Sequence, residues 1–495
     1  MALDMGDLPS ILLSNTYFYR FDPKQWKAAQ PYPPLGTIYA AAQLRQEGYK
    51  VSLFDTNLEE DPSSIKSYFE KASPSYYVIY DDGFNYLTKM CLSRMKEAAF
   101  EMIRIAKEYG ATVIMSSSDS TDHDQVYLNA GADFVIHGEG EVTLTELLQC
   151  LVSDISVGGI LGISYYKDGT YHKNPGRPVI RNLDMLPQPA WDLINIEPYK
   201  EIWLKKHGRV AVNIATTRGC PYKCNWCAKP IYGNRYNSRS PERVIDEISH
   251  LISKFDVRFF WMCDDIFGLK PNWVQEFNRL KKERGLEFEY KIQSRVDLML
   301  KEDNLDALAD SGAYEIWVGA ESGSQKILDA MDKGTQVEEI HEATRLLKKR
   351  DVRVAFFIQF GYPGEEWEDI KMTIDMILKL MPDDIGISVS YPLPGTKFYE
   401  KVKSELTQKS NWVDSDDLDL MFSNTYSPLF YKTLHRYVHD RYRIKKGWQN
   451  LIRIFSSPLV ELKSRSYDVL KMFYHLPQAG YRFLALRILP AVHKA

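Results

Sequence analysis

Three cysteines lie close together in a short stretch of the chain, RGCPYKCNWC (218–227). Cys220, Cys224 and Cys227 are separated by three and then by two residues, and Trp226 precedes the last of them. The chain of 495 residues has only six cysteines, a usage that favours metal binding in a reducing compartment over disulfides. Three thiolates on one loop can bind three irons of a [4Fe-4S] cluster. The fourth iron then has no protein ligand and is open to chemistry.

Zinc is the main alternative for these thiolates. A structural zinc ion takes four ligands, commonly from two pairs of closely spaced cysteines or histidines. Cys263 and His250 are candidates for a fourth ligand, but neither belongs to a second pair. We therefore favour the iron–sulfur cluster, and we interpret Cys91, Cys150 and Cys263 as buried or incidental thiols.

Residues 1–150 alternate short β-rich segments with amphipathic helical segments. This alternation predicts a Rossmann-like α/β domain with a parallel, doubly wound sheet, whose ligand binds at the carboxyl ends of the strands. The predicted strands are 11–16, 50–56, 76–82, 111–118 and 134–140. Their carboxyl ends carry small and polar residues, although ordinary turns use the same residue types: Asn15, Asp82, Gly83, Ser116, Ser117, Ser118, Gly138, Glu139 and Gly140.

A second alternating series occupies residues 206–404, after a proline-containing linker at 151–205 with a hairpin around Asp168-Gly169. The predicted strands are 210–217, 258–265, 290–297, 314–322, 354–361 and 385–394. Six β–α units predict a partial or full parallel barrel whose active site lies at the carboxyl ends of the strands. The cysteine loop follows the first of these strands and therefore belongs to that face.

The cysteine loop and the barrel segments together resemble the radical S-adenosylmethionine (SAM) superfamily. In that superfamily the open iron binds the methionine part of SAM, whose cleavage releases a 5′-deoxyadenosyl radical. Similar segments occur at the strand ends: CDDIF (263–267), SRVDL (294–298), VGAESGSQKILDAMDKG (318–334), FGYPGEE (360–366) and YPLPGTKFYE (391–400). The superfamily's usual Gly-Gly-Glu is absent from CDDIF. The resemblance implies SAM contacts for Trp226, Asp264, Asp265, Ser294, Arg295, Glu321, Gly361 and Tyr391.

The PGE and PLPGT motifs resemble one branch of the superfamily, which carries an amino-terminal cobalamin-binding domain. Segments 32–56 and 130–148 resemble passages of that domain. The resemblance implies that a flat corrinoid lies across the carboxyl ends of the front sheet, against the small and polar residues named above. No Asp-x-His-x-x-Gly motif supplies a lower axial histidine, and neither His123 nor His137 is assigned that role. A plain structural sheet domain is the alternative.

The two implied cofactors suggest a methyltransferase. The radical would abstract hydrogen from an unactivated carbon, which would then receive the methyl group of methylcobalamin, with electrons from an external flavodoxin or ferredoxin. We expect a hydrophobic polycyclic substrate, first a bacteriochlorophyllide or other tetrapyrrole side chain and next a hopanoid-like lipid. The alternatives are oxidative cyclisation, as in the anaerobic magnesium-protoporphyrin monomethyl ester cyclase, or a non-catalytic corrinoid or iron–sulfur sensor. Nucleic-acid modification, as in methylthiotransferases, is disfavoured because the body is acidic and no RNA-binding module is evident.

The predicted helical region 405–495 is basic. From Met421 onward it has 13 Lys or Arg and 3 Asp or Glu, a formal +10, which leaves −14 for the first 420 residues of a chain at −4. This tail could surround an apolar ligand, lie on an anionic membrane or close the barrel mouth. We see neither a signal peptide nor a run of about 18 apolar residues, so we expect a cytoplasmic protein with peripheral membrane contact.

Overall fold

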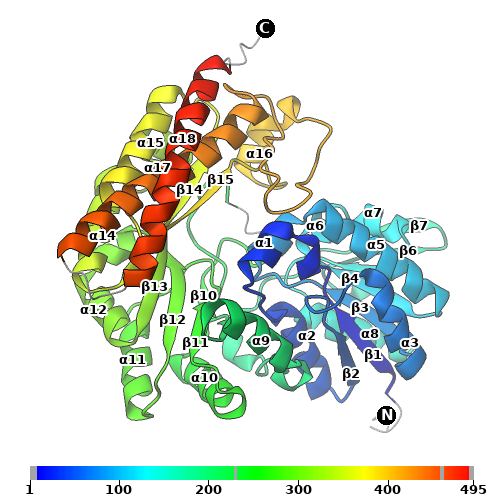
Figure 1. Ribbon diagram of the computed structural model, residues 1–495. Helices are drawn as coiled ribbons and strands as arrows, with labels where there is room; N and C mark the ends of the chain where they lie inside the picture. The colour runs from blue at the N-terminus through cyan, green and yellow to red at the C-terminus, as the bar shows by residue number, and fades with distance from the viewer. Residues whose placement is uncertain (1–7, 228–230, 457–461, 490–495) are drawn as a thin grey trace.

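The computed structural model describes residues 8–227, 231–456 and 462–489 and contains two large sheets, one mixed and one parallel (Figure 1). The front sheet has the order β2-β1-β3-β4-β5-β6-β7, in which the first five strands are parallel. These five are β1 (Ser10–Ser14), β2 (Lys50–Phe54), β3 (Tyr76–Tyr80), β4 (Thr112–Ser116) and β5 (Phe134–Ile136). All five predicted front strands are therefore confirmed, together with their parallel direction.

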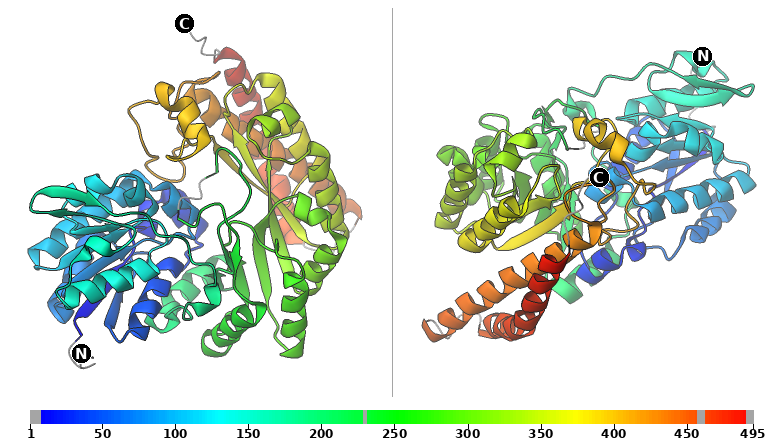
Figure 2. Two further views of the ribbon diagram at one scale, coloured as in Figure 1. Left: turned by 180° about the vertical axis from the view of Figure 1, so that it is seen from behind. Right: turned by 90° about the horizontal axis from the view of Figure 1, so that it is seen from above.

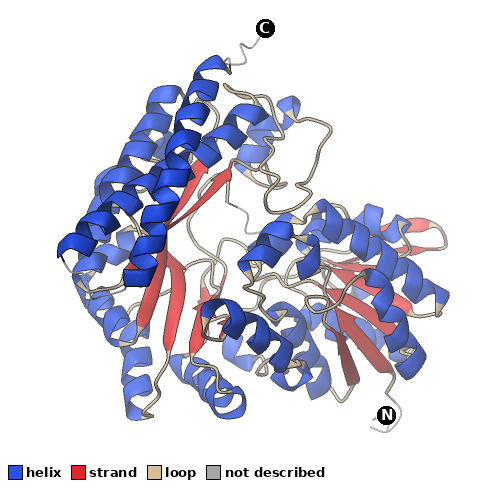
Figure 3. Cartoon of the chain, in the orientation of Figure 1, coloured by secondary structure: helices blue, strands red, loops and turns tan. Residues whose placement is uncertain are grey.

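Helices cover both faces of the front sheet (Figure 3). They include α2 (Leu35–Gln46), α3 (Lys66–Ala72), α4 (Tyr86–Met90), α5 (Ser93–Glu108), α6 (Ser118–Asp122), α7 (Asp124–Asn129) and α8 (Glu141–Val152). Successive residues Ile11, Leu12 and Leu13 of β1 are all fully buried. Since neighbouring strand residues point to opposite faces, a strand covered on both sides is apolar throughout, which is why this strand has no alternating pattern.

The predicted hairpin in the linker extends the front sheet. It consists of β6 (Ile163–Lys167) and β7 (Thr170–Lys173), and β6 pairs antiparallel with β5. The sheet thus continues past residue 150, the predicted end of the front domain. Helix α9 (Ile196–His207) then leads into the second sheet.

The second sheet is an open half-barrel with the order β15-β14-β13-β12-β11-β8, all parallel. Its strands are β8 (Ala211–Ile214), β11 (Phe259–Met262), β12 (Glu289–Ser294), β13 (Ala313–Glu321), β14 (Arg353–Phe360) and β15 (Asp384–Val389). The helices between them are α10 (Pro241–Phe255), α11 (Trp273–Glu283), α12 (Glu302–Asp310), α13 (Gln325–Ala330), α14 (Val337–Lys349) and α15 (Trp367–Leu380). Six parallel strands place all carboxyl ends on one edge, as predicted.

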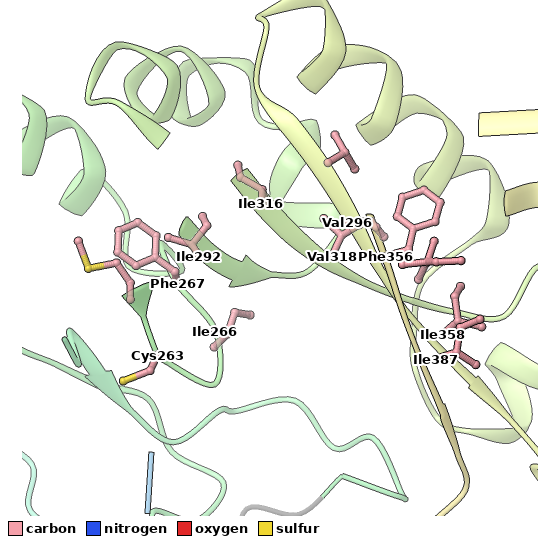
Figure 4. Packing of buried hydrophobic residues seen from close by; sticks show 14 of the residues in the cluster. Cys263, Ile266, Phe267, Ile292, Val296, Ile316, Val318, Phe356, Ile358 and Ile387 are labelled. Carbon is pink, nitrogen blue, oxygen red and sulfur yellow. The ribbon is translucent and has the colours of Figure 1, made fainter. Parts of the chain in front are cut away.

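Branched aliphatic and aromatic side chains fill the core of the half-barrel. Ile292, Ile316, Val318 and Phe356 come from three neighbouring strands and are all at most 1% exposed (Figure 4). Each fully buried side chain of this kind stabilises the fold by roughly 1.5–3 kcal/mol. This rigid core supports the loops at the carboxyl ends of the strands.

The carboxy-terminal region differs in part from the prediction. After α16 (Lys397–Val402), residues 406–427 form mainly loop, because Asp, Ser and Asn are frequent there and compete with helical hydrogen bonding. Helices α17 (Pro428–Ser456) and α18 (Leu462–Ile488) then pack against each other as a hairpin. The residue at 447 is glycine because a Cβ there would lie 2.6 Å from Cβ of Met472.

The hairpin covers one edge of the half-barrel. Helix α17 packs on α15 and on edge strand β15, and the Tyr442 hydroxyl donates to the carbonyl oxygens of Pro382 (2.7 Å) and Asp383 (2.9 Å). Covering an edge strand prevents its unpaired backbone groups from pairing with another chain. Figure 2 shows the hairpin projecting from the body. None of the described helices is long and apolar enough to span a bilayer.

Candidate functional site

The cysteine loop begins at a tight backbone turn. Strands β9 (Thr217–Arg218) and β10 (Asn237–Ser238) pair antiparallel on either side of the loop. Gly219 has φ of 77°, and a Cβ there would lie 2.2 Å from the carbonyl oxygen of Arg235. Only glycine is compatible with that conformation and that approach, so Gly219 sets the direction in which Cys220 leaves the sheet.

Asn225, between the second and third cysteines, anchors the loop to the barrel. Its backbone N–H donates to the Met331 carbonyl (3.0 Å), and its Nδ2 donates to the Ala330 carbonyl (2.8 Å). Its Oδ1 accepts from the Tyr362 hydroxyl at 2.9 Å, and its carbonyl accepts from the Phe398 N–H at 3.0 Å. Segments following β13, β14 and β15 thus hold one loop residue, which keeps the cysteines above the strand ends.

The donor set of the loop fits an iron–sulfur cluster. None of the six cysteines forms a disulfide, and Cys220, Cys224 and Cys227 all follow β8 at the carboxyl edge. Arg295 Nη1 lies 3.9 Å from Cys224 Sγ, so a cation neighbours one thiolate. Within the described residues, no three His, Cys, Asp or Glu side chains converge as ligands of one metal ion. A four-iron cluster binds each cysteine to a different iron, so it does not require such convergence.

A buried ion pair lies beside the loop. Lys333 Nζ is 2.8 Å from Glu321 Oε1, and both side chains are at most 7% exposed. Burial alone would lower the pKa of Lys333, but Glu321 and the Cys224 sulfur outweigh burial and raise the pKa. Lys333 therefore remains a cation, 5.9 Å from the Trp226 ring. Glu321 lies at the predicted strand end, with a left-handed backbone (φ 58°).

The two aspartates predicted to contact SAM have different partners. Asp264 is fully buried and accepts hydrogen bonds from the amides of Thr216 (2.6 Å) and Thr217 (2.9 Å). Burial raises the pKa of Asp264 to about 7. Asp265 instead pairs with Lys89 of the front domain at 2.5 Å. Asp264 thus braces the strand that precedes the cysteine loop, and Asp265 connects the two domains.

The remaining predicted SAM contacts lie at the same edge, and several already have protein partners. Arg295 stacks over the Tyr222 ring at 3.7 Å and donates to the carbonyl of Lys333, so it braces the cysteine loop. The hydrogen bonds of the others are Ser294 Oγ to the Phe267 carbonyl (3.2 Å), Gly361 N to Glu365 Oε2 (2.6 Å) and Tyr391 Oη to the Met90 carbonyl (3.3 Å). Trp226 Nε1 is buried without a hydrogen-bond partner among the described residues, and so can donate to a ligand.

Glu365 supplies a pH-dependent test of this edge. Burial raises the pKa of Glu365 from 4.5 to about 8, against the opposing effect of the Gly361 amide. The unfolded chain loses this proton first, so stability falls as pH rises from about 4.5 to about 8. We expect Glu365→Gln to reduce the loss of unfolding free energy between pH 5 and 8 by about 2 to 4 kcal/mol, measured by anaerobic urea unfolding. Parallel pH dependences of the two proteins would contradict this assignment.

The predicted corrinoid contacts also lie at the carboxyl edge of their sheet, where most organise loops. Asn15, Asp82, Ser117 and Ser118 are at most 5% exposed. Their bonds join Asn15 Oδ1 to Thr56 Oγ1 (2.7 Å), Asp82 Oδ1 to the Gly36 amide (3.0 Å), Ser117 Oγ to the Ser120 amide (2.9 Å) and Ser118 Oγ to the Lys89 carbonyl (3.0 Å). These side chains shape the surface on which a flat ligand would rest.

Two glycines of this edge, Gly83 and Gly138, face the second domain, whereas Gly140 packs within the front domain. A Cβ on Gly83 would lie 2.8 Å from Ile231 Cδ1, and one on Gly138 would lie 3.8 Å from the Ile231 carbonyl. A Cβ on Gly140 would approach Ser116 Oγ at 3.0 Å. Small residues therefore occupy this part of the front edge, and Ile231 covers some of it.

Arg218 joins the front sheet to the start of the cysteine loop. Its guanidinium is 4% exposed and lies 2.6 Å from Glu139 Oε1 and 2.7 Å from Glu141 Oε1. The rings of Tyr39 and Tyr232 lie within 5.3 Å of its central carbon. Glu139, a predicted corrinoid contact, is thus engaged in a buried ion pair between the domains.

Sequence reasoning missed Arg218, Lys89, Asn225 and Lys333, as well as Tyr86 at the start of α4. Tyr86 comes from the front domain and is 53% exposed, and partial desolvation together with the neighbouring charges of Cys227 and Glu321 raises its pKa. Arg218 and Asn225 stand within or beside the cysteine motif, so their position was an available signal. Lys89 and Tyr86 belong to a helix with no such signal.

Comparison with known proteins identifies the family. Residues 214–377 match the radical SAM superfamily. An uncharacterized methyltransferase of Pyrococcus horikoshii is 30% identical over 388 residues, which cover 77% of this chain and 81% of that protein. The chain belongs to the radical SAM superfamily. The prediction of a radical SAM enzyme is thereby confirmed.

Two further similarities concern the branch of the radical SAM superfamily. The anaerobic magnesium-protoporphyrin IX monomethyl ester cyclase of Cereibacter sphaeroides is 29% identical over 281 residues, 55% of this radical SAM chain and 45% of the cyclase. The structure of OxsB, a cobalamin-dependent SAM radical enzyme, superposes with a TM-score of 0.71 over 94% of this chain and 76% of OxsB, at 17% identity. The predicted order of front sheet, half-barrel and helical region is therefore a fold shared with such an enzyme.

Proposed function

We propose that this radical SAM protein is a cobalamin-dependent C-methyltransferase. The carrying observation is the way the two carboxyl edges meet: the cysteine loop of the half-barrel faces the carboxyl edge of the front sheet, and the ion pairs of Arg218 and Lys89 join the two. When bound, the [4Fe-4S] cluster supplies the electron that cleaves SAM, and cobalamin carries the methyl group. The front α/β domain precedes the half-barrel in the chain, and this order agrees with a corrinoid on the front domain and a cluster on the half-barrel.

The residues of this chain would bind and orient the cofactors, and they would exclude water from the site. Cys220, Cys224 and Cys227 would hold the cluster, and the Trp226 indole N–H is available to a ligand beside it. The Lys333–Glu321 pair places a cation and an acceptor at the same edge. The small residues Gly83, Ser116, Gly138 and Gly140 would contact the corrinoid, and Asp264 would keep the loop in position. Positioning of this kind is what the protein contributes to cofactor chemistry.

We propose a hydrophobic polycyclic substrate, with a tetrapyrrole side chain first and a hopanoid-like lipid second. The similarity to a cyclase that acts on a magnesium porphyrin ester supports the tetrapyrrole class. Each turnover would consume two SAM molecules, one yielding deoxyadenosine and methionine and the other S-adenosylhomocysteine. The two electrons required would come from an external flavodoxin or ferredoxin in the cytoplasm.

Anaerobic incubation with methyl-labelled SAM, a reductant, cobalamin and candidate bacteriochlorophyllides tests the proposal. We expect the product to gain one labelled CH2 unit, with deoxyadenosine and S-adenosylhomocysteine in equal amounts, as measured by mass spectrometry. A hopanoid substrate is run in parallel. Deoxyadenosine with an oxidised, unlabelled product would instead support the second candidate, oxidative cyclisation, which the cyclase similarity favours. Bound corrinoid without any deoxyadenosine would indicate a sensor.

A further inference from the structure

Helix α18 carries an exposed apolar stripe that the hairpin does not use. Six large side chains along one line of the helix are each 59–79% exposed: Tyr467, Leu470, Tyr474, Tyr481, Leu484 and Ile488. Pro477 occupies the remaining place in the same repeat. Their spacing of three and four residues places them on one helical face. A contiguous exposed apolar row of this length is unusual on a protein surface that contacts only water.

The opposite face of α18 packs against α17. Met472, Ala479 and Leu486 are at most 6% exposed, and Met472 contacts Gly447 of α17. His475 is also buried, with its Nδ1 2.8 Å from Asp440 Oδ1. Because this face joins the hairpin, the exposed stripe is available to a second partner.

The charges of the hairpin favour an anionic partner. Its two described acidic residues point inward: Asp440 pairs with His475 and Arg482, and Asp468 accepts from Asn450 Nδ2 at 2.9 Å. On the stripe side, Lys471 lies 4.1 Å from the Tyr467 ring and Arg487 is exposed. The stripe is thus apolar and aromatic with cations and, among the described residues, no exposed carboxylate.

We propose that α18 docks in the interface of a membrane that contains anionic lipids. Apolar and aromatic side chains inserted at headgroup depth, with Lys and Arg beside them, are the properties of an interfacial helix. A second copy is a poorer occupant, because pairing the stripe with itself would bring its cations together without neutralising carboxylates. This inference goes beyond the proposed reaction and does not depend on it, although a hydrophobic substrate would be accessible at such a surface.

Flotation of the full-length protein with vesicles tests the docking. We expect binding to phosphatidylglycerol-containing vesicles that is at least about tenfold stronger than binding to phosphatidylcholine alone. The variant Leu470→Ser/Tyr481→Ser/Leu484→Ser should lose about tenfold or more of that affinity. Met185→Ser/Ile155→Ser is the matched control, since both residues are exposed apolar side chains outside the hairpin and should leave binding unchanged.

Charge reversal separates electrostatic attraction to anionic lipids from insertion of the apolar stripe. Lys471→Glu/Arg487→Glu should weaken binding to anionic vesicles by about tenfold and leave residual binding to neutral vesicles unaltered. Deoxyadenosine formation without vesicles should be unchanged in every variant, so failure of docking and failure of the proposed reaction are distinguishable. Equal binding of all variants, or no binding of the parent protein, would overturn the proposal. So would concentration-dependent dimerisation in ultracentrifugation that the serine variant abolishes, because the stripe would then serve a second copy.

Discussion

Replacing Cys224 by alanine is expected to abolish deoxyadenosine formation. In the proposed cluster each of the three loop cysteines would bind a different iron, so removal of one would leave a cluster that is incomplete or lost. We expect iron and sulfide content to fall and SAM cleavage to drop to the uncatalysed background. Cluster content is measured by iron and sulfide analysis of anaerobically purified protein, and cleavage by chromatography of deoxyadenosine.

The matched control is Cys150→Ala. Cys150 is partly buried in α8, on the front domain, and should be dispensable for both readouts. Zinc instead of iron in the parent protein, or an active Cys224→Ala variant with full iron content, would contradict the proposed cluster. Cys220→Ala and Cys227→Ala should behave like Cys224→Ala, since the proposed cluster would need all three thiolates.

Replacing Arg218 by methionine should have the largest effect on stability. Arg218 is the buried cation between Glu139 and Glu141, and its removal leaves two carboxylates buried without compensation. Breaking a buried ion pair in this way costs about 3–5 kcal/mol. We expect a loss of that size in the unfolding free energy, measured by anaerobic urea denaturation. The change should also weaken the cluster, because Arg218 directly precedes Gly219 and Cys220.

A compensated variant distinguishes charge from packing. In Arg218→Met/Glu139→Gln/Glu141→Gln neutral amides replace both carboxylates, so no buried charge is left uncompensated and most of the lost stability should return. If the triple variant is no more stable than Arg218→Met, then the cation contributes by packing against Tyr39 and Tyr232 and not by neutralising charge. A loss below about 1 kcal/mol for Arg218→Met would contradict the buried pair altogether.

The elements of the fold were predictable because their signals are local. Strand β1 is a short apolar segment, and α10 begins with Pro241 after the capping Ser240, whose Oγ accepts from the Arg243 amide at 3.3 Å. The hairpin of β6 and β7 was also predicted, but its membership in the front sheet was not. Pairing β6 with β5 is a long-range choice that no turn signal encodes.

The position of the candidate site was predictable from the sequence, but the contacts that its side chains make were less so. Asp264 and Arg295 were expected to touch SAM, and both stand at the predicted strand ends. Asp264 nevertheless bonds to the amides of Thr216 and Thr217, and Arg295 stacks on Tyr222. A motif reports which residue types gather at an edge. Which of them face a ligand and which brace a loop depends on neighbours from other elements.

By itself, the sequence determined the three thiolates, their place after the first barrel strand and the alternation that yields two parallel sheets. These properties depend on spacing within a few residues, which chain geometry translates directly into structure. Only the tertiary structure decided that Arg218 neutralises Glu139 and Glu141, that Lys89 reaches Asp265 and that α18 leaves an apolar stripe exposed. Those contacts join distant segments, and their partners are selected by burial and charge in the folded chain.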